Sequence, residues 1–203
     1  MTRKKHIDVL LEQAAIPKDL RDAVYVAVPI SGGTRLWDLA HQHKVADINM
    51  VKRRFPAEYK TRVLRPNLAD AERIAVLASK LFPQKTVVNP AKVDVPGWSQ
   101  EQYRRAWKQF ISRFIAAIVA SPGWSHSHGC IEEVLHAAKS QIPVFDLTGT
   151  LLSTDDIREE LDRARNEAVR RGLRVAFLGK VTRFRARLET SANDRHRVAL
   201  LCK

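Results

Sequence analysis

The sequence has only two cysteines, Cys130 and Cys202, and they lie far apart. Such a pair gives no framework of a small disulfide-stabilised protein, so stability has to come from a packed core. No apolar run approaches the roughly 20 residues that cross a bilayer. The N-terminal stretch MTRKKHIDVLLEQAA is charged and lacks the small-residue cleavage pattern of a signal peptide. These absences predict a cytoplasmic protein without a membrane partner.

Two common phosphate-binding motifs are also missing. The sequence contains no G-x-G-x-x-G after an apolar run and no G-x-x-x-x-G-K-[ST]. The fingerprints of dinucleotide-binding proteins and of P-loop proteins are therefore absent. No internal repeat or low-complexity segment is present either. A nucleotide site in this chain would have to use other loops.

Positive charge, by contrast, is in excess: 35 Lys and Arg stand against 22 Asp and Glu, for a formal net charge of +13. The excess is concentrated in residues 44–65 and 170–203. Clustered cations attract phosphates, so these segments predict contact with a nucleotide or a nucleic acid. A solvated basic face without a ligand explains the same charges and stays an alternative.

With 203 residues, of which 45% are hydrophobic, the chain can bury the core of one principal domain. Five short apolar runs are typical of strands buried on both faces, as in a parallel sheet. We expect these strands at 24–30, 86–90, 116–121, 142–147 and 174–179. Helical spacing or helix caps mark the other segments, at 6–16, 68–82, 100–114, 128–140 and 154–171. The alternation predicts an α/β domain with a mostly parallel five-stranded sheet and helices on both faces.

Around this domain, at 23–179, the sequence predicts three additions. They are an N-terminal helical extension at 1–22, a basic and irregular insertion at 34–66, and a basic segment at 180–203. Three helix starts have capping residues. Asn67 is expected to cap the second helix, Ser99 forms a capping box with Gln102, and Ser153 or Thr154 caps the last helix.

In such sheets, ligands bind beyond the carboxyl ends of the strands, which selects the loops 30–34, 89–97 and 121–129. The first contains Ser31 and Gly32-Gly33. Its glycines let the backbone approach a ligand and its hydroxyl can bind one, although an ordinary tight turn needs the same residues.

The third loop, SPGWSHSHGC, leads into a helix that we expect to begin near Ser127 to Gly129. Its first N–H groups suit an anion, and simple N-capping by a serine is the alternative. Apolar spacing places Glu132 at the flank of the buried face and Glu133 nearly opposite it. The polar residues His126, His128, Cys130 and His136 match no zinc pattern, so neither a metal nor a cofactor is predicted.

The order of these motifs resembles the nucleoside 2-deoxyribosyltransferase superfamily. A strand leaves through Pro-Ile-Ser-Gly, a second ends in Asn89-Pro90, and a helix with Tyr103 follows. The last motif is W-x-x-S-x-G-x-x-x-E, with Trp124, Ser127, Gly129 and Glu133 in its fixed positions. It is similar to an uncharacterised branch related to deoxynucleoside-monophosphate N-glycosidases. The resemblance covers about 24–33 and 67–147.

The resemblance implies a Rossmann-like fold, cleavage or transfer at the N-glycosidic bond of a nucleotide or nucleoside, and a homo-oligomer. It assigns Glu133 as the nucleophile, and a carboxylate can indeed stabilise an oxocarbenium-like centre and then bond to it. It assigns Ser127 to the 5′-phosphate of a nucleoside monophosphate. By the same resemblance Ser31, Gly32 and Gly129 contact substrate.

Some positions depart from the family pattern. Acids that many members carry are replaced here by Ala116 and by Trp107-Lys108, and Asp94 is a possible substitute. Tyr103 and Trp124 can stack on a base, although a buried aromatic is the commoner role. Two other classes of function stay open. One is a non-catalytic nucleotide-binding or sensing module, and the other is a nucleic-acid-binding protein that uses the basic segments.

Overall fold

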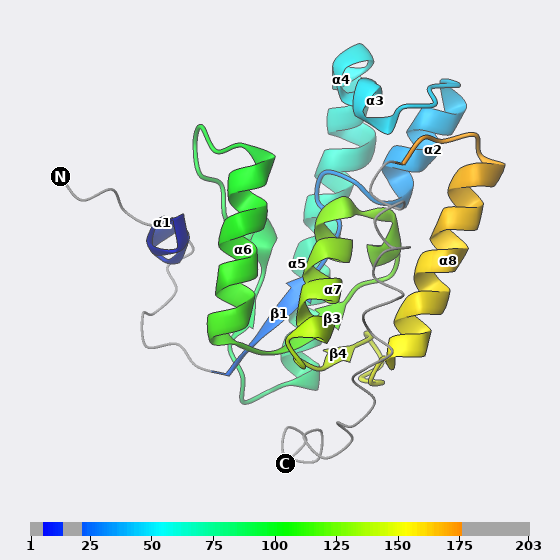
Figure 1. Ribbon diagram of the computed structural model, residues 1–203. Coiled ribbons are helices and arrows are strands. Elements are labelled where there is room, and N and C mark those ends of the chain that lie inside the picture. The colour runs from blue at the N-terminus through cyan, green and yellow to red at the C-terminus, as the bar shows by residue number, and fades with distance from the viewer. Residues whose placement is uncertain (1–5, 14–21, 176–203) are drawn as a thin grey trace.

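The computed structural model describes residues 6–13 and 22–175, in which strands and helices alternate (Figure 1). The strands are β1 (Ala23–Ala27), β2 (Val87–Val88), β3 (Ile115–Ala120) and β4 (Val144–Phe145). The helices are α1 (His6–Gln13), α2 (Thr34–Gln42), α3 (Ile48–Arg54), α4 (Pro56–Tyr59), α5 (Arg65–Leu81), α6 (Gln100–Phe114), α7 (His128–Lys139) and α8 (Thr154–Arg170). Short 3₁₀ turns, η2 (Pro90–Lys92) and η3 (Trp124–His126), and a π turn, η1 (Lys60–Leu64), complete the order.

The sheet is parallel, with the strand order β2-β1-β3-β4. The predicted parallel α/β architecture is therefore confirmed, but the number of strands is wrong, because the described sheet has four. The outer edge of β4 is occupied by Leu151, which forms an antiparallel bridge with Phe145. Arg174, at the start of the predicted fifth strand, bridges Asp47 instead. Residues 176–179 of that strand lie outside the described residues.

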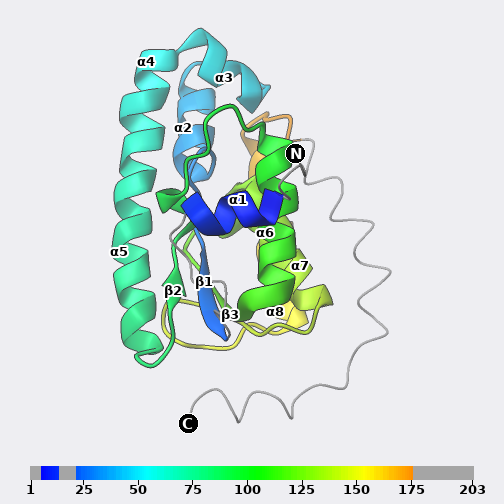
Figure 2. The ribbon, with the colours of Figure 1, turned by 90° about the vertical axis from the view of Figure 1, so that its left-hand side faces the viewer.

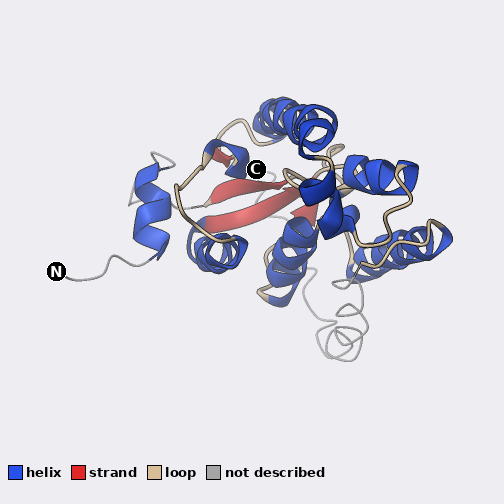
Figure 3. Cartoon of the chain, turned by 90° about the horizontal axis from the view of Figure 1, so that it is seen from above, coloured by secondary structure: helices blue, strands red, loops and turns tan. Residues whose placement is uncertain are grey.

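Helices cover both faces of the sheet, as predicted (Figures 2 and 3). One face, with Val24, Val26 and Val119, packs against Ala71 and Ala78 of α5. Tyr25 and Ile118 point to the opposite face and pack with residues of α6, α7 and α1. This alternation follows from the two-residue repeat of a strand. Apolar runs without alternation, such as AVYVA, are needed because both faces are buried.

The insertion at 34–66 was expected to be irregular with at most a short helix or two, but it is more helical than that, since α2, α3, α4 and η1 fill most of it. Asn67 is not the cap of α5 but lies within its first turn. Pro66 also lies in that turn, where a missing N–H is tolerated, so the helix can begin before it. A π turn joins α4 to α5 and makes the run from Pro56 to Leu81 almost continuous.

The predicted capping box of α6 and the predicted cap of α8 are confirmed, and the cap of α8 proves to be a capping box as well. Ser99 caps α6 with Gln102 as its partner, and Ser153 caps α8 with Asp156. In each box the serine hydroxyl and the partner side chain satisfy backbone N–H groups that the first turn leaves open. None of the helices in the described part of the chain has the length and apolar character needed to span a bilayer.

Candidate functional site

The two central strands, β1 and β3, mark the point where the chain reverses its direction across the sheet. After β1 the chain moves toward β2, and after β3 it moves toward β4. Ligands of open α/β sheets bind at such a point, beyond the carboxyl ends of the strands. The loops that leave β1 and β3 meet here, since the Gly33 N–H donates to the His126 carbonyl at 3.2 Å. A methyl group on Gly32 would lie 3.5 Å from Ser127 Oγ.

The loop after β1 is held in place through its carbonyl groups. Asn67 Nδ2 donates to the carbonyls of Ile30, at 3.0 Å, and Gly32, at 2.9 Å. The Tyr59 hydroxyl donates to the Ser31 carbonyl at 3.2 Å. Asn67 itself is 3% exposed and accepts from Arg35 at 2.8 Å. Three successive carbonyls are thus fixed by two helices of the insertion and α5, which preforms the loop.

We expect Asn67→Ala to lower the free energy of unfolding by about 2–3 kcal/mol, because it removes a buried amide and leaves two partly buried carbonyls without their donor. Urea unfolding measures this change. Asn166→Ala, on the exposed side of α8, is the matched control and should change stability by about 0.5 kcal/mol or less. Equal losses of unfolding free energy in the two variants would contradict a role of Asn67 in holding the loop after β1.

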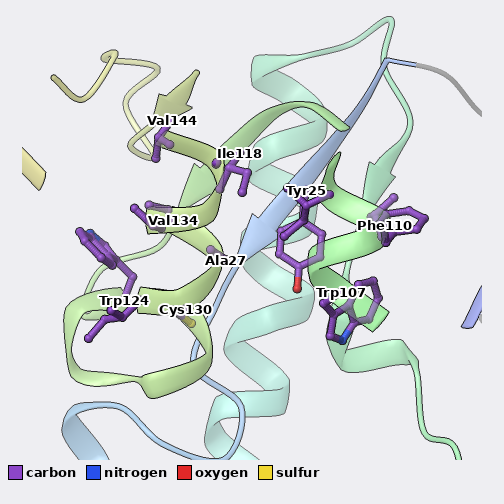
Figure 4. Packing of buried hydrophobic residues seen from close by; sticks show 14 of the residues in the cluster. Tyr25, Ala27, Trp107, Phe110, Ile118, Trp124, Cys130, Val134 and Val144 are labelled. Carbon is purple, nitrogen blue, oxygen red and sulfur yellow. The ribbon is translucent and has the colours of Figure 1, made fainter. Parts of the chain in front are cut away.

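Glu133 lies against the core rather than away from it, so the predicted orientation is wrong. The Tyr25 hydroxyl, on the fully buried strand β1, donates to Glu133 Oε1 at 2.9 Å. Apolar spacing correctly indicated that Ile131 and Val134 of α7 are buried, but Cys130 and Ala137 are buried as well. This turns the buried face toward residue 133, which is three residues after Cys130 and four before Ala137. Figure 4 shows Tyr25 lying between β1 and Trp107 of α6.

The surroundings of Glu133 favour its neutral form. Burial raises the pKa of the Glu133 carboxyl to about 8, and the negative charge of Glu132 adds to the rise. The Tyr25 hydrogen bond and the charge of Lys108 act in the opposite direction. Burial, together with Glu133, also raises the pKa of the Tyr25 hydroxyl well above its usual range. Tyr25 therefore stays a hydrogen-bond donor at every pH at which Glu133 titrates.

The neighbouring Glu132 has the opposite environment. It lies 3.1 Å from Lys108 Nζ, 3.3 Å from His128 Nε2 and 3.5 Å from Arg104 Nε. The hydrogen bond with His128 and then the one with Lys108 lower the pKa of Glu132 to about 2. At neutral pH, Glu132 is ionised while most Glu133 is protonated. Adjacent carboxyls with pKa values this far apart are a common feature of acid–base sites.

Ser127 occupies the N-cap position of α7, but its side chain makes no capping hydrogen bond. The simple N-cap interpretation is therefore not what the structure shows. The residue is 7% exposed, and its side chain bonds to Cys130. A methyl group on Gly129 would meet no described atom within 4 Å. The start of α7 thus combines the N–H groups of a first helical turn with open space at Gly129, which suits an anion.

Part of the polar stretch before α7 binds α8, a role that sequence reasoning missed. Ser125 Oγ donates to Glu160 at 3.0 Å, and His126 Nε2 lies 3.0 Å from Glu167. The His126 ring also packs 4.4 Å from the Trp37 ring. The two acids are seven residues apart on α8 and so share one face. The seven-residue spacing of these acids was the sequence signal that could have predicted their contact with the polar stretch.

The remaining predicted residues lie in different surroundings. Tyr103 and Asp94 lie together, 3.4 Å apart, and the Tyr103 hydroxyl also accepts from the Val95 N–H. These contacts tie Tyr103 to Asp94 and Val95, in the predicted loop 89–97. Trp124 is 4% exposed and belongs to the core, which leaves no free face for stacking on a base (Figure 4).

The other polar residues considered as metal ligands point to separate partners. His128 pairs with Glu132, and His136 Nε2 lies 2.7 Å from Ser112 Oγ of α6. Cys130 is buried, which raises the pKa of its thiol well above the usual range.

Tyr25 is a residue of the candidate site that sequence reasoning missed. Its signal was a single hydroxyl in an otherwise aliphatic strand, because a buried tyrosine usually needs a hydrogen-bond partner. Tyr25 bonds to Glu133 of α7, and Ser127, the N-cap residue of the same helix, lies beside Gly32 of the loop after β1. Comparison of the chain with models of protein families, with curated proteins and with solved structures finds no match.

Proposed function

We propose that this protein cleaves or transfers the N-glycosidic bond of a nucleoside 5′-monophosphate, with Glu133 as the nucleophile. The observation that carries the proposal is the Tyr25–Glu133 hydrogen bond of 2.9 Å beside the reversal point of the sheet. A carboxyl with a raised pKa is more basic, and hence more reactive, once it is ionised. Tyr25 fixes Oε1, which orients the second oxygen for attack.

In the proposed reaction, the Glu133 carboxylate attacks the anomeric carbon as the bond to the base breaks. The bonding electrons leave with the base, which takes a proton from solvent. Water, or a second base in a transfer reaction, then displaces the carboxylate from the glycosyl ester. The carboxylate is regenerated and no oxidant or reductant is needed. Tyr25 donates to Glu133 in every step and so holds its position.

The phosphate is proposed to lie at the start of α7, near Ser127 and the Ser31–Gly32 loop. The closeness of Gly32 to Ser127, and the open space around Gly129, support this placement. The N–H groups of a helix start and a serine hydroxyl are common ligands of phosphate. The excess of positive charge favours the same class of substrate.

The test is incubation with nucleosides and their 5′-monophosphates between about pH 6 and 9, followed by chromatography for free base. We expect base release from monophosphates, with kcat/KM rising toward pH 8, because the nucleophile must be ionised and its pKa is about 8. Only about a tenth of the carboxyl is ionised at pH 7. A rate that falls over this range would instead make Glu133 a general acid. Binding without turnover would select the nucleotide-sensing module.

A further inference from the structure

A second feature lies beside the site, in the helical segment 52–65 that joins α3 to α5. We call it the basic helical segment. It contains the six cations Lys52, Arg53, Arg54, Lys60, Arg62 and Arg65, and Glu58 is its one acid. In Figure 1, α3 and α4 lie at the end of the molecule toward which β1 points, above the carboxyl ends of the strands. The segment is therefore on the same end as the candidate site.

Most of these cations have no acidic neighbour. Glu58 bonds to Arg62 at 3.0 Å and to His43 at 3.1 Å, so its charge is already shared. In the ranges 6–13 and 22–175, none of the other five cations has a carboxylate within ion-pair distance. Arg53, Arg54, Lys60 and Arg65 are also exposed. Five positive charges close together without counter-charges repel one another and gain from a polyanion.

The π turn brings two of these cations together. In η1, the Arg65 N–H donates to the Lys60 carbonyl, five residues earlier. A residue five positions along an α-helix lies on the other side of it, whereas a π turn returns it toward the first residue. The π turn therefore places Lys60 and Arg65 nearer to one face of the helix than an α-helix would. Such π turns are rare and occur often at functional sites.

Lys52 connects the basic helical segment to the site. Its Nζ lies 5.3 Å from the centre of the Tyr59 ring, and the Tyr59 hydroxyl donates to the Ser31 carbonyl. Burial lowers the pKa of Lys52, because the ring does not fully replace the lost water. An anion placed here would favour its charged form. The segment is thus in contact with the loop that we assign to substrate.

We propose that the basic helical segment binds the phosphodiester backbone of a single-stranded nucleic acid. The cations lie on α3 and on the continuous helical run of η1 and the start of α5. The two helical runs are separated at Phe55, and a flexible strand can follow this corner whereas a stiff duplex cannot. A membrane surface fits less well, because interfacial helices also insert apolar side chains. The exposed large apolar residues, Met50, Val76, Leu77, Leu151 and Val169, all lie outside the segment.

The experiment measures fluorescence anisotropy of a labelled single strand of about 20 nucleotides, from about 50 to 200 mM salt. Lys60→Gln/Arg65→Gln is compared with Lys80→Gln/Arg165→Gln, which changes the net charge equally at exposed positions of α5 and α8. We expect the first pair to weaken binding about tenfold or more at low salt. It should also reduce the slope of log K against log salt by about 1.4, at 0.7 per phosphate contact. The second pair should leave both nearly unchanged.

Arg53→Gln/Arg54→Gln provides an independent variant and should reproduce the loss, with unfolding midpoints confirming that each protein is folded. Three results would overturn the proposal: no binding at about 50 mM salt, equal losses in segment and control pairs, or binding to phosphatidylserine vesicles alone. The proposal does not rest on catalysis. Glu133→Gln should bind the strand like the wild type, so a failure of turnover and a failure of strand binding are distinguished.

Discussion

Glu133→Gln is expected to abolish base release, with kcat at least about 10³-fold lower, while nucleotide binding changes by less than about threefold. Glutamine keeps the shape of the side chain, and its oxygen can still accept from Tyr25. The amide, however, cannot form a glycosyl ester. Chromatography for free base and calorimetric titration with a nucleoside monophosphate measure the two effects separately. Full activity of this variant would end the proposed mechanism.

Glu132→Gln is the matched control, because it removes a carboxylate from the adjacent residue. Glu132 contacts Arg104 and Lys108 of α6 and His128 of α7 instead of Tyr25, so we expect turnover within about tenfold of the wild type. The loss of its negative charge also removes one cause of the raised pKa of Glu133 and frees Lys108, which lowers it. The rate should therefore reach its plateau at a lower pH. An unchanged profile would show that the two carboxyls are not coupled.

The sequence predicted best what depends on local chemistry. The capping box of Ser99 with Gln102 and the cap at Ser153 involve residues at most three positions apart, and the structure contains both. The buried strands were recognisable because a strand covered on both faces must be apolar throughout. The rule for parallel sheets, which is nearly independent of side chains, selected the loops 30–34 and 121–129, and the structure brings these two loops into contact.

The features that failed depend on contacts between distant residues. Glu133 was predicted to lie opposite the buried face. The apolar spacing of α7 alone cannot reveal that Tyr25 of β1, 108 residues away in the sequence, donates a hydrogen bond to it. Asn67 is of a residue type that often caps helices, but its side chain donates hydrogen bonds to the carbonyls of Ile30 and Gly32. The fifth strand has a suitable apolar pattern, yet Leu151 already occupies the edge of β4. In each case a tertiary contact overrides a local preference.

The same Glu133→Gln substitution is expected to stabilise the protein by about 3 kcal/mol at pH 8 and to have little effect near pH 4. The unfolded carboxyl ionises above its ordinary pKa of 4.5, whereas the folded one keeps its proton up to about pH 8. Between these values the unfolded state binds fewer protons, so stability falls as pH rises, by up to about 1.4 kcal/mol per unit. Some exposure of the residue reduces the full amount.

Urea unfolding of the wild type, Glu133→Gln and Glu132→Gln at several pH values measures these changes in stability. For Glu132, the dependence of stability on pH has the opposite sign. The pKa of Glu132 is lowered to about 2, so its contribution is present above pH 4.5 and is lost as pH falls through 2. Glu132→Gln should therefore destabilise the protein at pH 7, by about 2 kcal/mol, since its ion pairs are partly exposed. A structural carboxyl stabilises the fold that holds it, whereas one retained for chemistry can weaken it. If Glu133→Gln instead lowers stability at pH 8, Glu133 is a structural hydrogen-bond partner of Tyr25 and the case for a nucleophile at this position is lost.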